Sequence, residues 1–387
     1  MRICFVTTGD LMTIATGKRA TGMAGPLAAL GHDVSIIMQD TPTNRGRLAL
    51  ECPGAQALLF PGGPALAEVR QKRALLRQAR PDVVYTCSFG VRNRVTPLVG
   101  RRLPVRLVEH SELRSGIPDL SARQRRVERA LEWAAALSFD GQICASRYLE
   151  QEFGRMMHRA HRRRPLLYLP YAYNEHVLQP PTLDMSALRA RYAGRRVVLY
   201  MGTLTENYGL FQMLEAARSL RQTRPDFVLL LLGRGRHADR AAEFVTTHHL
   251  ADCVELLGYV PETELAAHFQ LASVFLLPLL DTVQDWARCP SKLFMYLPFE
   301  KPIVTCPVGE AREHLGDDGF YFAPGDVLGL TAQIGRALAV GEHWRPRRDY
   351  HEHSWPRRAA TFADWVLSCW GERLGARDGQ GGQGGAL

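Results

Sequence analysis

Residues 273–307 read SVFLLPLLDTVQDWARCPSKLFMYLPFEKPIVTCP, and this stretch decides the fold. Its first five residues are an apolar run that predicts a strand buried on both faces, as in a parallel sheet. After a loop, Pro290 and Ser291 predict the start of a helix in which Ser291 caps the free amide groups. A helix that begins after a parallel strand can bind an anion, and Lys292 adds a positive charge. The stretch therefore predicts a site for a phosphate-bearing ligand.

The same order of strand, loop and helix extends outward from this stretch over most of the chain. A length of 387 residues is too long for one ordinary core and fits two domains. Alternating strands and helices predict doubly wound α/β domains with parallel sheets. We expect an N-terminal domain at 1–175, a C-terminal domain at 176–350, a helix at 351–373 that packs back over the domain junction, and a disordered Gly-rich tail at 374–387.

The composition is globular, with 46% hydrophobic and 22% charged residues and no apolar run long enough to span a bilayer. The chain starts with a strand-like segment and not with a signal region, so a cytoplasmic location is expected. Eight cysteines are scattered without a CxxC pair. This pattern predicts neither a zinc site nor a disulfide framework.

The net charge of +9 comes mostly from arginine. Two basic runs, 123–130 and 155–164, have two interpretations. They are solvated helix faces, or they attach the protein peripherally to anionic lipid at the inner face of a membrane, with Met156 and Met157 beside the arginines. Nucleic acid is not an expected partner, because no recognition fold or interleaved aromatic residues accompany the charge.

Candidate ligand residues follow the predicted strands, at the carboxyl edge where open α/β sheets bind ligands. His110 ends one predicted strand, and small basic loops follow others. The loop before Lys18 is not a GxGxxG motif, which argues against a dinucleotide cofactor. The loops expected to open onto one cleft are 16–18, 110–112, 202–207, 233–236 and 286–292.

Six segments resemble the retaining glycosyltransferases of family 4. They are LAALGHDVSII (27–37), RRVERALEWAAALSFDGQICASRYL (125–149), VVLYMGTLTENYGLFQMLEAARSL (197–220), FVLLLLGRGR (227–236), VELLGYVPETELAAHFQLASVFLLP (254–278) and CPSKLFMYLPFEKPIVT (289–305). Their order along the chain matches that family. The resemblance implies the GT-B fold, in which two Rossmann-like domains face each other across a cleft.

The resemblance also implies an activity. A sugar would move from a UDP- or GDP-linked nucleotide-sugar to a small-molecule, glycan or lipid-linked acceptor, with retained configuration and without a bound metal or other cofactor. Lys292 and Arg288 would stabilise the departing diphosphate, and His110 would contact the donor sugar near the reacting carbon. The implied donor-binding residues are Gly17, Lys18, Gly202, Thr203, Gly233, Arg234, Ser291, Leu293 and Met295.

The chain also departs from the family pattern. Where relatives carry an Arg and a Lys in the donor-domain loop, it has Thr203 and, approximately, Tyr208. A family pair of glutamates falls at Ala287 and Met295, and a methionine cannot accept hydrogen bonds from a ribose diol. A second hypothesis is therefore a GT-B binding or partner protein without turnover. A nonhydrolysing nucleotide-sugar epimerase is a third, for which His110 and its neighbour Glu112 are the candidate groups.

Overall fold

A computed structural model describes residues 1–11, 17–87, 104–181 and 183–378. The chain divides into two compact units, of which the first comprises Met1–Ala172, Ala287–Cys289 and Ser354–Leu387 and the second comprises Tyr173–Trp286 and Pro290–His353. Both are α/β units with parallel sheets, which confirms the predicted fold class of two Rossmann-like domains. The helix that the sequence predicts at 92–101 lies outside the described residues.

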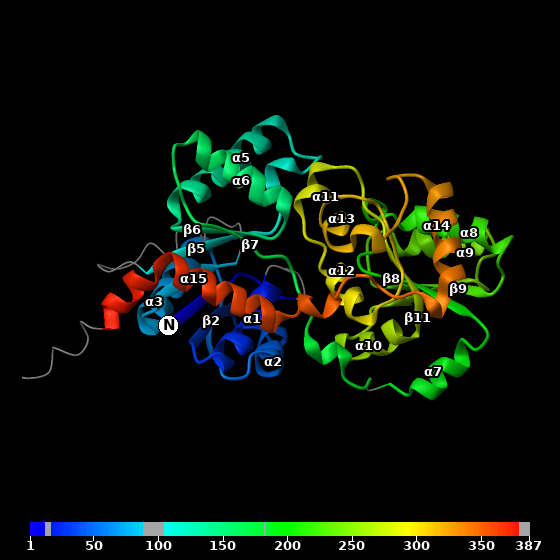
Figure 1. Ribbon diagram of the computed structural model, residues 1–387, viewed down its shortest axis with the longest axis horizontal. Helices are drawn as coiled ribbons and strands as arrows, with labels where there is room; N and C mark the ends of the chain where they lie inside the picture. Colours follow the sequence, from blue (N-terminus) through cyan, green and yellow to red (C-terminus); the bar gives the residue numbers. More distant parts are fainter. Residues whose placement is uncertain (12–16, 88–103, 182, 379–387) are drawn as a thin grey trace, which may run out of the picture. The chain divides into compact units, whose positions relative to one another are not determined.

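The sheet of the first unit has the strand order β3-β2-β1-β4-β5-β6-β7, with every pair parallel. Figure 1 labels β2, β5, β6 and β7 of this sheet. Its strands are β1 (Arg2–Val6), β2 (Asp33–Gln39), β3 (Gln56–Phe60), β4 (Val83–Thr86), β5 (Val105–His110), β6 (Gly141–Cys144) and β7 (Leu166–Tyr168). Its helices are α1 (Lys18–Ala29), α2 (Pro42–Glu51), α3 (Ala65–Ala79), η2 (Arg114–Gly116), α5 (Ala122–Ser138), α6 (Arg147–Arg159) and α15 (Trp355–Asp378).

The sheet of the second unit has the order β10-β9-β8-β11-β12-β13, and it is also parallel throughout. Its strands are β8 (Arg196–Met201), β9 (Phe227–Leu232), β10 (Val254–Gly258), β11 (Ala272–Leu277), β12 (Ile303–Thr305) and β13 (Phe320–Tyr321). Its helices are η3 (Glu175–Leu178), α7 (Met185–Arg191), η4 (Glu206–Tyr208), α8 (Leu210–Arg221), α9 (Ala238–Thr247), α10 (Glu262–Leu271), α11 (Val283–Ala287), α12 (Ser291–Tyr296), η5 (Leu297–Phe299), α13 (Gly309–Leu315), η6 (Gly316–Asp318), α14 (Val327–Val340), η7 (Gly341–His343) and η8 (Tyr350–His353).

Both sheets repeat one topology. In each, the first strand in the sequence lies beside the second on one side and the fourth on the other, so the strand order reverses between β1 and β4 and again between β8 and β11. In open α/β sheets the crevice at such a reversal, outside the carboxyl ends of the strands, is where ligands bind. The topology therefore marks one candidate edge in each unit.

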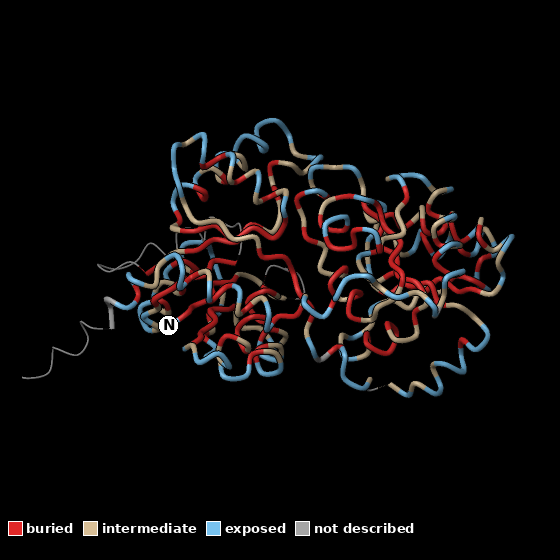
Figure 2. The backbone as a smooth tube through the Cα atoms, viewed as in Figure 1, coloured by how far each residue is buried: buried red, intermediate tan, exposed pale blue. Residues whose placement is uncertain are grey.

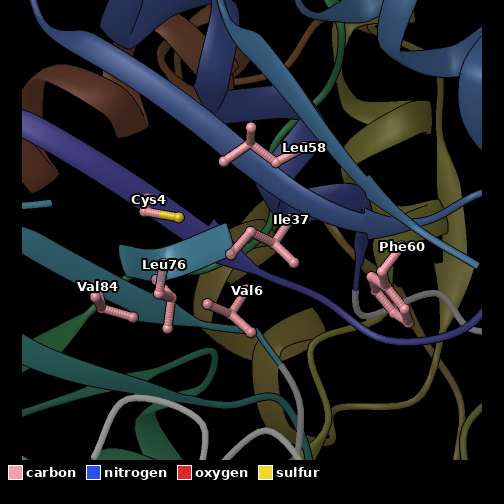
Figure 3. Close-up of a cluster of buried hydrophobic side chains, with 7 residues drawn as sticks. All are labelled: Cys4, Val6, Ile37, Leu58, Phe60, Leu76 and Val84. Carbon is pink, nitrogen blue, oxygen red and sulfur yellow. The ribbon is translucent and has the colours of Figure 1, made fainter. Parts of the chain in front are cut away.

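Apolar strand sequences form the cores. All six residues of β9, FVLLLL, are buried, as expected for a strand covered on both faces. Figure 2 shows similar buried stretches along the other central strands. Figure 3 shows a cluster in the first unit to which β1, β2, β3, β4 and α3 contribute Cys4, Val6, Ile37, Leu58, Phe60, Leu76 and Val84.

Polar side chains fix several helix starts. The Ser121 hydroxyl accepts a hydrogen bond from the Gln124 amide at the start of α5, and Ser146 does the same for the Leu149 amide at the start of α6. Asp326 caps α14. Serine at both positions fits the preference of helix N-caps for a side chain that accepts a backbone hydrogen bond.

The C-terminal helix α15 packs against α1 within the first unit. A Cβ atom at Gly22 of α1 would lie 2.4 Å from the Trp355 ring, so glycine permits this close approach. Because α15 continues to Asp378, the prediction of a tail from residue 374 is wrong for 374–378. Leu374 still buries its side chain and so extends the packed face of the helix. Residues 379–387 of the predicted tail lie outside the described part.

Candidate functional site

The candidate site of the second unit lies where its strand order reverses, at the carboxyl ends of β8 and β11. Gly202 directly follows β8 and pairs with the strand next to it, because its amide donates to the Leu232 carbonyl over 2.8 Å. The Leu204 amide donates to the Arg234 carbonyl over 2.9 Å, so the loops after β8 and β9 are joined backbone to backbone. Both predicted glycine loops therefore reach one edge.

Glycine is required in both of these loops. Gly202 has φ +153° and Gly233 has φ +143°, which L-residues rarely adopt. A Cβ atom at Gly233 would lie 1.8 Å from the Gly202 carbonyl oxygen, and one at Gly202 would lie 2.5 Å from the Lys292 Nζ. Because neither glycine has a side chain, the two loops can touch, and Lys292 can lie against the Gly202 loop.

Lys292 brings a positive charge to this edge. Lys292 is half-buried, and its ammonium donates a hydrogen bond to the Tyr200 hydroxyl over 3.1 Å. That hydroxyl donates to the Thr203 carbonyl, also over 3.1 Å. The Nζ lies 4.4 Å from the centre of the Tyr200 ring and 5.0 Å from that of Tyr208. Sequence analysis missed these tyrosine contacts.

Helix α12 carries Lys292 and is held by its buried face. The Tyr296 hydroxyl accepts a hydrogen bond of 2.8 Å from the Met201 amide at the end of β8. The Tyr296 ring stacks on Phe275 of β11, with centroids 4.2 Å apart and planes 6° apart. These contacts fix the start of α12 relative to the carboxyl ends of both strands.

The start of α12 differs from the prediction. The helix has six residues, its N-cap is Pro290, and no side chain caps it, so the prediction that Ser291 caps the helix is wrong. The Leu293 amide donates to the Pro290 carbonyl over 3.0 Å, because the helix begins with a tight turn. In this conformation the Leu293 amide donates within its own chain, and the predicted contact of Leu293 with a donor stays a prediction. The predicted anion site at this helix start therefore depends on the Lys292 side chain, and it stays a prediction.

The other predicted donor residues of this unit lie around the same loops. Thr203 and Arg234 are exposed, and the Arg234 guanidinium lies 4.9 Å above the ring of Tyr259, which follows β10. Ser291 and Met295 are half-buried. Their predicted contacts with a donor stay predictions.

In the first unit, His110 ends β5 and is fully buried. Its ring stacks on Phe153 at 3.5 Å between centroids, and its Nε2 lies 2.8 Å from the Gln142 Oε1. The Gln142 Nε2 donates to the Ala136 carbonyl, so the assigned orientation of the amide makes His110 Nε2 a donor. The described surroundings of His110 are thus structural contacts, and its contact with a donor sugar stays a prediction.

The residue before His110 belongs to a buried charge pair that sequence analysis missed. Arg19 of α1 and Glu109 of β5 are fully buried, with Arg19 Nε 2.9 Å from Glu109 Oε1. The Tyr85 hydroxyl donates to Glu109 over 3.1 Å, and Arg19 donates to the Leu169 and Pro170 carbonyls over 2.7 and 3.2 Å. Burial raises the pKa of the Glu109 carboxyl above its ordinary value, and the Arg19 charge opposes this rise. No periodic pattern marks either residue in the sequence.

The remaining predicted residues also fall in the first unit. Gly17 is buried at the N-cap of α1, and Lys18, the first residue of that helix, is half-buried. Arg288 is half-buried, and its charge acts on Glu112. Burial raises the pKa of the Glu112 carboxyl, while the charges of Arg114 and Arg288 act to lower it.

The structure changes the basis of the membrane hypothesis. Met156 and Met157 of α6 are 1% and 5% exposed, so the expectation that they accompany the arginines at a membrane surface is wrong. They face inward because α6 packs its apolar side on β6 and β7. No helix in the described part of the chain is both long and apolar enough to cross a bilayer. Among the same residues, no group of three or more His, Cys, Asp or Glu side chains is placed to hold a metal ion.

Two protein-family models match the chain. Residues 17–164 match glycosyltransferase family 4, and residues 195–339 match the glycosyl transferases group 1. The amylovoran biosynthesis glycosyltransferase AmsK of Erwinia amylovora is 30% identical over 169 residues, which cover 43% of this chain and 41% of that protein. The GDP-mannose-dependent alpha-(1-6)-phosphatidylinositol monomannoside mannosyltransferase of Mycolicibacterium smegmatis is 26% identical over 224 residues, or 55% and 54% of the two chains. The chain thus spans about half or less of the length of these curated relatives.

Solved structures match nearly the whole chain. Anabaena HepE in complex with UDP and glucose has a TM-score of 0.67 at 15% identity and covers 98% of this chain and 100% of its own. Sucrose-phosphate synthase from Thermosynechococcus elongatus has a TM-score of 0.68 at 18% identity, with 98% and 97% covered. At this identity the likeness shows a shared fold, with two parallel-sheet domains.

Proposed function

Because the chain belongs to the group 1 glycosyltransferases of the family 4 type, we propose that it transfers a sugar from a nucleotide-sugar to an acceptor and retains the anomeric configuration. The observation that carries the proposal is the Lys292 ammonium at the carboxyl ends of β8 and β11. A cation fixed where a diphosphate departs stabilises the charge that develops in the transition state. Lys292 has this role in the second unit. The reaction then needs no resident metal.

The donor is a UDP- or GDP-linked sugar. HepE is described with UDP and glucose, and the mycobacterial mannosyltransferase is named for GDP-mannose. The loops that hold the diphosphate are those of Gly202 and Gly233, with Thr203, Arg234, Ser291 and Met295 at their edge. The acceptor is a small molecule, a glycan or a lipid-linked sugar.

The test is binding of nucleoside diphosphates followed by a search for turnover. Isothermal titration and thermal melting with UDP and with GDP should show that one of the two nucleotides binds. Lys292→Ala should weaken the binding of that nucleotide by at least about tenfold, because the charge-assisted contact is lost. Lys301→Ala is the matched control, since Lys301 is half-buried in the same unit but follows η5. If neither nucleotide binds the unaltered chain, or if the two variants bind equally well, the proposal fails.

A partner protein without turnover is the second candidate. It is favoured by Ala287, which is fully buried, and by Met295, because neither side chain can hold a ribose as a carboxylate does. This candidate predicts nucleotide binding with neither transfer nor slow donor hydrolysis across a panel of UDP- and GDP-sugars. Release of free nucleoside diphosphate from any donor, lost in Lys292→Ala, would exclude it.

Attachment to an anionic membrane is part of the proposal for the acceptor side. On α5, Arg123 and Arg126 are exposed, and Val127, the neighbour of Arg126, is 52% exposed. Arginines beside exposed apolar side chains suit an interfacial helix on anionic lipid. Phosphatidylcholine vesicles with added phosphatidylglycerol should carry the protein in flotation, whereas neutral vesicles should not. Equal flotation of the double variant Arg123→Ala/Arg126→Ala would contradict this.

A further inference from the structure

The Lys292 ammonium lies between two tyrosine rings that come from different elements. Tyr200 is the second-last residue of strand β8, and Tyr208 ends η4. The distances of 4.4 and 5.0 Å from Nζ to the ring centres are within the range of cation–π attraction, which extends to about 6 Å. Both rings therefore hold the same charge.

Hydrogen bonds orient the Tyr200 hydroxyl so that it accepts from the Lys292 ammonium. The Tyr200 hydroxyl donates its proton to the Thr203 carbonyl, so it presents a lone pair to the ammonium. The ammonium has three N–H bonds, and Tyr200 accepts one of them. Gly202 makes room for the lysine, because a Cβ atom there would lie 2.5 Å from Nζ and 3.1 Å from the Tyr200 hydroxyl oxygen.

An aromatic ring can hold a lysine ammonium without bringing a negative charge to it. A carboxylate would hold the ammonium but cancel its charge, whereas an aromatic face attracts a cation through its quadrupole and carries no net charge. A second lysine near Nζ would repel it while the site is empty. Two ring faces therefore hold the ammonium without adding a negative charge of their own.

We propose that Tyr200 and Tyr208 form an aromatic cradle that positions the Lys292 ammonium for the diphosphate of the donor, and that the ring of Tyr208, not its hydroxyl, is the determinant. This inference rests on the proposed function. Tyr208 is a positioning residue: it acts on the diphosphate through Lys292.

The lysine content of the chain makes the cradle directly observable. The protein has four lysines, at 18, 72, 292 and 301. Carbon-13 labelling of lysine side chains therefore gives four ε-methylene signals, and Lys292→Arg assigns the relevant one. A methylene above ring faces resonates upfield, so the Lys292 signal should be displaced from that of Lys301. Lys72, whose Nζ lies 4.8 Å from the Phe60 ring centre in the first unit, is an internal reference for folding.

Variants at 208 separate the ring from the hydroxyl. In Tyr208→Phe the Lys292 signal should stay upfield, and UDP or GDP should bind within about twofold of the unaltered chain. In Tyr208→Leu, or Tyr208→Gln if the leucine variant shifts the Lys72 signal, the Lys292 signal should move downfield and binding should weaken about tenfold, the scale of one desolvated cation–π contact.

The outcomes are distinguishable from failure of the proposed function. If no nucleoside diphosphate binds the unaltered chain, the proposed function fails, while the position of the Lys292 signal still decides whether the cradle exists. A Lys292 signal at the position of an ordinary lysine overturns the cradle. So does loss of binding in Tyr208→Phe, because the hydroxyl would then be the determinant.

Discussion

Removing the negative charge from the buried pair of Arg19 and Glu109 is the most informative perturbation of stability. In Glu109→Gln the side chain keeps its size and one oxygen for Arg19 Nε, but the guanidinium loses its counter-charge at zero solvent exposure. Charges about 4 Å apart attract by about 4 kcal/mol at an effective dielectric constant of about 20. Loss of one partner of a buried pair costs about 3–5 kcal/mol. We expect the free energy of unfolding to fall by that amount.

The opposite substitution, Arg19→Met, should lower the free energy of unfolding less than Glu109→Gln does. An arginine cannot release its proton in a protein, whereas a carboxyl group can take one up. In Arg19→Met the buried Glu109 escapes its isolated charge by protonation, and its folded pKa rises further above the unfolded value of about 4.3 because the opposing charge is gone. A carboxyl with a raised folded pKa contributes full stability below the unfolded pKa and loses it as the pH rises. Compared with the unaltered chain, Arg19→Met should therefore be less destabilised at pH 5 than at pH 8.

Urea unfolding followed by tryptophan fluorescence measures both effects, since Trp133, Trp355, Trp365 and Trp370 all lie in the same unit as the pair. Glu150→Gln is the control, because the Arg147–Glu150 pair of the same unit is 2.8 Å long but 47% and 30% exposed, and such pairs contribute less than about 1 kcal/mol. If Glu109→Gln costs no more than Glu150→Gln, or if the deficit of Arg19→Met is the same at both pH values, the reasoning is refuted.

Four further variants test the packing of the second unit and of α15, the cap of α14, and the contact between Tyr200 and Lys292. Gly233→Ala should lower the free energy of unfolding in urea by more than about 2 kcal/mol, because its Cβ would collide with the Gly202 carbonyl at a positive φ. Gly371→Ala, in α15 where a Cβ meets open space, should raise it by up to about 1 kcal/mol. Asp326→Ala should cost about 1 kcal/mol through loss of the cap of α14, and an unchanged midpoint would contradict this. Tyr200→Phe keeps its ring but loses the bond to Lys292, so a fall in kcat larger than the rise in KM is expected for a donor that turns over, and equal kinetics would argue against it.

The repeated fold could be predicted because its signal is local. Strands buried on both faces read as continuous apolar runs such as FVLLLL at 227–232, and short loops with glycine separate them from amphipathic helices. Lys292 could be singled out for the same reason, since it follows a buried strand and a proline. The helix start was predicted less well: Ser291 lies one position inside the helix that it was expected to cap, and boundaries of this kind depend on hydrogen bonds that a pattern does not contain.

The sequence by itself thus determined two α/β units of parallel strands and the segment that carries Lys292. Only the tertiary structure decided what surrounds that cation. Lys292 and Tyr200 are 92 positions apart, and they meet because β8 and β11 are neighbours in a sheet whose order does not follow the sequence. The pairing of Arg19 with Glu109 could not be predicted from the sequence either, because the two side chains meet only when α1 packs against the sheet. Contacts of single side chains carry no periodic signal, and so they become visible only after the strands have been ordered.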